Sequence, residues 1–110
     1  MAQPTITPGS FNKLVASAGV AEALSSVSLK VMWFLVQAIP GNTGNVFLGA
    51  SDVDSTRGLV IEPSMSQPVN LDVPDAFHAG GLRLDLSEWY IDAANSADGV
   101  VVLYGLYPGD

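Results

Sequence analysis

The sequence predicts an all-β fold, an antiparallel β-sandwich of about eight short strands. Clusters of Gly, Pro, Asn and Asp interrupt the chain at intervals of roughly 8–12 residues, as turns do in sandwiches and barrels. Between these clusters apolar and polar residues alternate at a period of two, and helical periodicity is sustained nowhere. These observations favour sheets packed face to face over any helical or mixed fold.

The length of 110 residues is typical of one domain with one core. Residues 1–10 contain Pro4, Pro8 and Gly9, and we expect them to form an extended arm before a single domain at 11–110. Two interpretations of the arm are open: a frayed terminus, or a segment that orders on a neighbouring chain.

The charge content excludes some classes of partner. Only 14% of residues are charged, against roughly 25% in an average soluble domain, so we expect another protein chain to cover part of the surface. The chain has 11 Asp and Glu but only 4 Lys and Arg, and its cations (Lys13, Lys30, Arg57 and Arg83) are scattered. Because nucleic acids and anionic membranes need clustered cations, we expect neither as a partner. No apolar run approaches the ~20 residues of a spanning helix, so we expect a soluble protein.

The predicted strands are 11–17, 27–39, 45–51, 58–62, 69–71, 82–87, 89–93 and 100–107. Residues 18–24 fit either a connection or one helical turn. Segment 31–62 is expected to be a meander of neighbouring strands, to whose edges the others add. A turn at 41–44 separates its first two strands, because Gly and Asn there tolerate a positive φ.

The second predicted strand is apolar on both faces near its middle. One face carries Val27, Leu29, Val31, Trp33 and Leu35, and we expect it to pack inside the sandwich. The opposite face becomes apolar at Met32, Phe34 and Val36. A sandwich buries only one face of each sheet, so a partner subunit is the simplest cover for this second face. The last predicted strand, 100–107, is likewise apolar on both faces.

Four aromatic residues have two open interpretations. Trp89 and Tyr90 are adjacent and point to opposite sides of a strand, so one is expected in the core and the other outward. An outward aromatic serves as an interface anchor or stacks on a sugar, but both rings are equally compatible with the core. The same alternatives hold for Tyr104 and Tyr107. The hypothetical interface with another protein chain therefore comprises Met32, Phe34, Val36, Trp89, Tyr90, Tyr104 and Tyr107.

No motif predicts catalysis, a cofactor or a metal site. Asp52 and Asp54 begin like a calcium loop, but the sixth and twelfth places hold Arg57 and Pro63 instead of Gly and Glu. A solvated turn is the better interpretation. His78 is the only histidine, and no Gly-x-Ser-x-Gly elbow is present for a triad with His78 and Asp75. We therefore expect a protein that is not an enzyme.

The run Asn-Thr-Gly at 42–44, with the apolar triplet 46–48, Gly49, a polar turn and the strand and proline at 58–63, resembles small structural proteins of tailed bacteriophages. The runs 84–92 and 100–107 are similar to that group too. The resemblance implies a β-sandwich with jelly-roll-like connections, commonly trimeric, found as capsid decoration (cement) proteins, head fibres or tail accessory parts.

From this resemblance we expect a decoration protein on the capsid surface of the virion. It would bind the major capsid protein as a homo-oligomer, in the form of a trimer, and stabilise the head. The alternative is a tail or head-fibre accessory module that binds a receptor or a carbohydrate.

Overall fold

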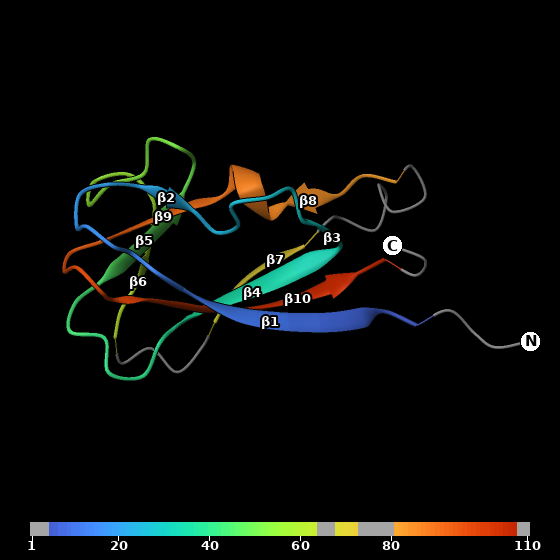
Figure 1. The fold of residues 1–110 in the computed structure, drawn as a ribbon, viewed down its shortest axis with the longest axis horizontal. Coiled ribbons are helices and arrows are strands. Elements are labelled where there is room, and N and C mark those ends of the chain that lie inside the picture. The colour runs from blue at the N-terminus through green and yellow to red at the C-terminus, as the bar shows by residue number, and fades with distance from the viewer. Residues whose placement is uncertain (1–4, 64–67, 73–80, 108–110) are drawn as a thin grey trace, which may run out of the picture.

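The structure, a computed structural model, describes residues 5–63, 68–72 and 81–107. Its ten described strands form two four-stranded antiparallel sheets and one two-stranded pair, as Figure 1 shows. The predicted all-β antiparallel architecture is confirmed, whereas the jelly-roll connectivity stays a prediction. The strands are β1 (Thr7–Leu14), β2 (Glu22–Ala23), β3 (Lys30–Val31), β4 (Trp33–Ala38), β5 (Val46–Gly49), β6 (Leu59–Ile61), β7 (Val69–Asp72), β8 (Leu84–Asp85), β9 (Tyr90–Ala93) and β10 (Gly99–Leu106).

Sheet A has the strand order β1-β10-β4-β7, and sheet B has the order β2-β9-β5-β6. In Figure 1, sheet A extends along the lower part of the view and sheet B lies above its left half. The short pair β3-β8 lies beside them, and a 3₁₀ turn at Leu86–Glu88 links β8 to β9. The two sheets share one hydrophobic core, to which Phe34 and Val102 contribute from sheet A and Leu48 and Ile91 from sheet B.

The first strand begins earlier than the sequence predicts. Residues 7–10, assigned above to the arm, are part of β1 and pair with β10 from Thr7 opposite Leu106 to Leu14 opposite Gly99. Proline is tolerated in a strand that lies at a sheet edge, and β1 is the edge of sheet A next to β10, so Pro8 does not prevent this pairing. Residues 1–4 of the predicted arm lie outside the described part of the chain.

The expected meander of 31–62 is confirmed for β5 and β6, which pair with each other, but its first strand does not pair with β5. β4 pairs with β10 and β7 in sheet A, whereas β5 pairs with β9 and β6 in sheet B. The turn at 41–44 therefore carries the chain from one sheet to the other. Residues 18–24, interpreted above as a connection or a helical turn, contain the short strand β2 on the edge of sheet B.

The chain bends between β3 and β4, and this bend exchanges the faces of the second predicted strand. Val31 and Phe34 are both fully buried, although strict alternation would place them on opposite faces. The bend lies at Met32, whose N–H donates to the Gly105 carbonyl at 2.8 Å. Met32 thus acts as an inserted residue between two strands, and it moves every later side chain to the other face.

The expected interior face is therefore wrong beyond Val31. Phe34 and Val36 are fully buried, whereas Trp33 and Leu35 are only half-buried on the other side of β4. Val27, expected inside, is 68% exposed. Phe34 also meets Trp89 edge to face, with ring centroids 5.5 Å apart, so this part of the predicted contact face belongs to the core.

Candidate interaction surface

The outer face of sheet A is an apolar surface that the described strands leave uncovered. The register aligns Ser10, Leu103, Leu35 and Asn70 in one row across all four strands. Neighbouring rows add Val101 and Trp33. Leu103 is 40% exposed, and Leu35, Val101 and Trp33 are half-buried. We call these four residues, Trp33, Leu35, Val101 and Leu103, the apolar centre of the outer face.

Charge is nearly absent from this face. The polar residues that flank the apolar centre are uncharged: Ser10, Asn12, Gln37 and Asn70. Asp72, opposite Trp33 on the edge strand β7, is the only charged residue that the described part of sheet A places there. Lys13 lies in the row of the buried Val100, and hence toward the opposite face.

Gly105 allows Trp33 to lie flat over β10. Gly105 is buried, and a Cβ added to it would come within 2.5 Å of the indole Nε1 of Trp33 and 2.8 Å of Cγ2 of Ile6. Only glycine leaves that space empty at this position in the strand. Ile6, just before β1, is itself 42% exposed, so the apolar surface continues to the end of the sheet.

The outer face is uneven. One shallow hollow is lined by Met32, Trp33, Leu35, Asn70 and Asp72, and a second by Ser10, Leu35, Gln37, Pro68, Val101 and Leu103. The two hollows share Leu35. The face thus combines partly exposed apolar side chains with shallow depressions.

Only part of the predicted interface set lies at the surface. Phe34 and Val36 are fully buried, and this corrects their assignment as contact residues. Met32 is half-buried and lines a hollow of the outer face. The predicted need for a cover on β4 and β10 thus applies to the apolar centre instead of to Phe34 and Val36.

The four aromatics differ in their surroundings. Trp89 packs on the core but also lines a hollow with Gly49, Ala50 and Glu88. Tyr90 is half-buried in β9. Tyr104 is half-buried against the core, with its ring 6.0 Å from that of Phe11. Tyr107 is only 9% exposed, donates its hydroxyl to the Leu82 carbonyl at 2.8 Å and lies under the Arg83 guanidinium. Tyr107 is therefore held within the chain.

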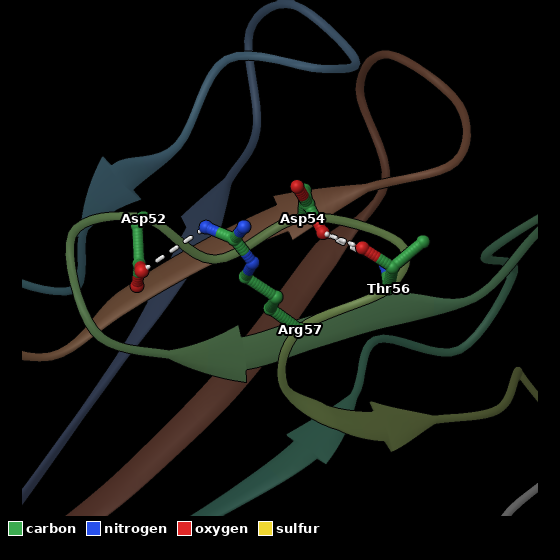
Figure 2. Close-up of polar contacts among 4 residues, drawn as sticks. All are labelled: Asp52, Asp54, Thr56 and Arg57. Carbon is green, nitrogen blue, oxygen red and sulfur yellow. Dashed lines mark hydrogen bonds and ion pairs between the residues drawn. The ribbon is translucent and has the colours of Figure 1, made fainter.

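The acidic turn after β5 forms its own internal contacts (Figure 2). Asp54 accepts hydrogen bonds from the Thr56 N–H at 2.8 Å and the Thr56 hydroxyl at 2.7 Å, which lower the pKa of the Asp54 carboxyl. Asp52 forms an exposed ion pair with Arg57 at 3.4 Å. Within the described ranges, no three His, Cys, Asp or Glu side chains are grouped closely enough to hold a metal ion. His78 and Asp75 lie outside those ranges.

A buried carboxylate holds the Asn-Thr-Gly turn in place. Asp98 is 6% exposed and accepts from the N–H groups of Thr43 (3.0 Å) and Gly44 (2.8 Å) and from the Thr43 hydroxyl (3.1 Å). Burial tends to raise the pKa of Asp98, but these donors hold it below its usual value. The Asn42 side chain donates to the Gly99 carbonyl and accepts from the Gly99 N–H. This network, which we call the Asp98 clamp, fixes the crossing between the sheets.

A second carboxylate, Asp85, organises the other end of the molecule. It accepts from the Ser28 hydroxyl at 2.6 Å, from the Ser87 N–H and hydroxyl, and from the Leu29 N–H. These donors, that of Ser28 first, lower the pKa of Asp85 strongly. Asp85 thereby caps the 3₁₀ turn and ties it to β3. The carboxylates of Asp98 and Asp85 therefore both have structural roles.

Comparison of the chain with protein-family models, curated proteins and solved structures gives no match. Among the described residues no helix has the length and apolar character needed to cross a membrane.

The bend at Met32 explains half of the difference between the predicted and the observed surface, since it moves Trp33 and Leu35, which the sequence pattern assigns to the interior, to the outer face. The sequence pattern does not single out Val101 and Leu103 on β10. The available signal was the run of apolar residues on both faces of segment 100–107, which indicated that one side of this strand would remain uncovered.

Proposed function

We propose that this chain is a structural protein of a phage virion, a capsid decoration protein that binds the major capsid protein as a homo-oligomer and stabilises the head. The observation that carries the homo-oligomer in this proposal is the apolar and nearly uncharged outer face of sheet A. The sequence resemblance described above adds the virion as the place of action and the trimer as the assembly.

Partly exposed apolar side chains grouped on one face favour assembly as the role of this face. Monomeric proteins rarely expose a contiguous apolar area larger than a few hundred Å², and larger patches mark interaction sites. Full burial of one large apolar side chain contributes on the order of 1.5–3 kcal/mol, before the costs of association are subtracted. Four partly exposed residues at the apolar centre are therefore enough to support a modest contact.

A capsid lattice multiplies weak contacts. An oligomer that touches several capsid subunits at once gains avidity, since each further contact forms at high effective concentration. A small domain with few charges is thus able to bind a head firmly although each separate contact is weak.

The test is binding to heads that lack the protein. Purified protein is expected to co-sediment with decoration-free heads and to restore their resistance to heat and to chelator. Absence of binding, together with unchanged head resistance when the protein is removed, would overturn the proposal. Heads that already carry the protein serve as the control, because their sites are occupied.

One observation favours a second candidate, a carbohydrate-binding accessory module. Trp89 and Glu88 line the same hollow, and an aromatic ring beside a carboxylate is a common arrangement for sugar binding. This candidate predicts binding on a glycan array that disappears in Trp89→Ala with the fold intact. An array without signal would count against it.

A further inference from the structure

We infer that the outer face of sheet A is covered by further copies of this same chain, which pack on one another through Trp33, Leu35, Val101 and Leu103. The inference deepens the proposed function, because it names the partner of this face and leaves the capsid contact to other surfaces. It is tested on the purified protein alone, so its failure is distinguishable from a failure of head binding.

Charge favours a second copy over a partner of opposite charge. The chain carries a net charge of −7, and two copies repel each other wherever their carboxylates meet. Each described acidic residue except Asp72 belongs to a strand or turn outside sheet A. Contact through the outer face therefore keeps these carboxylates apart and places Asp72 at the rim, on the edge strand β7.

The area of the outer face is close to what self-association needs. Strands lie about 4.8 Å apart and rise about 3.3 Å per residue, so the four strands of sheet A, with eight, eight, six and four residues, present roughly 400 Å². Two such faces together remove roughly 800 Å² from water, against roughly 1,000 Å² for a specific interface. Ile6 and Leu14, 42% and 52% exposed at or beyond the two ends of β1, are available to extend the contact.

The outer face has both projecting side chains and hollows. Leu103 is 40% exposed, and Leu35 lines two shallow hollows on the same surface. A side chain of one copy is thus able to fill a hollow of the next, as in the interdigitated layers of packed sheets. A face that pairs with itself needs no second kind of surface.

The decisive variant is Leu103→Asp, which places a carboxylate in each copy at the apolar centre. The wild type is expected to elute in size-exclusion chromatography with light scattering as an oligomer of the 11.5-kDa chain. In Leu103→Asp the dissociation constant should rise at least ~100-fold, since several like charges are brought together in an apolar contact. The matched control is Leu59→Asp, a 50% exposed strand residue of sheet B, which should leave the mass unchanged.

Each outcome decides a separate point. A monomeric wild type at micromolar concentration, or equal loss of the oligomer in both variants, overturns the inference. Circular dichroism and thermal unfolding of Leu103→Asp establish that the monomer is folded, and Leu35→Ser provides a second, uncharged disruption of the same face. A measured mass of two chains would support contact through the outer face of sheet A but contradict the trimer of the proposed function. If the folded, monomeric Leu103→Asp variant still binds heads, the decoration role is supported and does not require self-association.

Discussion

At the scale of single residues, Asp98 shows how one carboxylate directs the chain between two sheets. Three donors converge on it from Thr43 and Gly44, residues that follow β4 and precede β5. A charged acceptor with several backbone donors gives stronger hydrogen bonds than neutral pairs do. The Asn-Thr-Gly turn on which the phage resemblance depends thus has a structural role in this chain.

We predict that Asp98→Asn destabilises the protein by about 1.5–3 kcal/mol, because the amide loses the charge and leaves a donor of the turn without its acceptor. The measurement is the free energy of unfolding in a denaturant titration. Asp52→Asn is the control, since its ion pair is exposed, and its effect should stay within about 0.5 kcal/mol. Equal stability of both variants would mean that the Asp98 clamp does not hold the crossing.

At the scale of elements, β4 is defined by the bend that precedes it. The sequence pattern from 27 to 36 is continuous, and nothing in it separates a straight strand from two strands with an extra residue between them. The bend arises where Met32 donates to Gly105 on the neighbouring strand, a contact between residues far apart in the chain. Local alternation therefore predicts a strand correctly and still assigns its faces wrongly.

Truncation of side chains along β4 tests which face of this strand lies in the core. Phe34→Ala should cost about 3–5 kcal/mol, because Phe34 is fully buried and meets Trp89. Leu35→Ala should cost clearly less in the monomer, since Leu35 is half-buried on the outer face. Denaturant unfolding is to be performed at the lowest practical concentration, so that association does not add to the stability. The reverse order of costs would restore the assignment of faces made from the sequence.

At the scale of the whole molecule, the free energy of unfolding should decrease at acidic pH. The pKa values of Asp98 and Asp85 are lowered in the folded state, by the donors described above. A carboxyl with a depressed folded pKa contributes stability above its unfolded pKa of about 3.9, and this contribution is lost as the pH falls through the folded pKa. Glu22, whose pKa is lowered by the hydrogen bond from Lys13, adds in the same direction.

The free energy of unfolding is therefore expected to be nearly constant between about pH 7 and 5 and to decrease below about pH 4. Urea titrations at a fixed protein concentration measure this dependence. The double variant Asp85→Asn, Asp98→Asn should start from lower stability and show a flatter decrease, because two of the titrating groups are gone. An unchanged slope in the double variant would contradict the assigned role of these carboxylates.

The sequence by itself determined the class of fold and the places of most strands. The positions of β5, β6, β9 and β10 follow within a few residues from the turn residues at 41–44 and 95–99 and from the alternation of apolar and polar residues in the adjacent segments. Turn chemistry and period-two patterning are local properties of the sequence. It also indicated that β10 would have one apolar side without cover. These features depend on neighbouring residues alone, and so a single chain is sufficient to predict them.

Only the tertiary structure decided which strands share a sheet and which side chains form the uncovered face. The assignment of β4 to sheet A and β5 to sheet B depends on partners distant in the chain, as does the bend at Met32. A shift of one residue moves every later side chain across the sheet. For that reason the uncovered apolar face carries Trp33, Leu35, Val101 and Leu103, while Phe34 and Val36 fill the core.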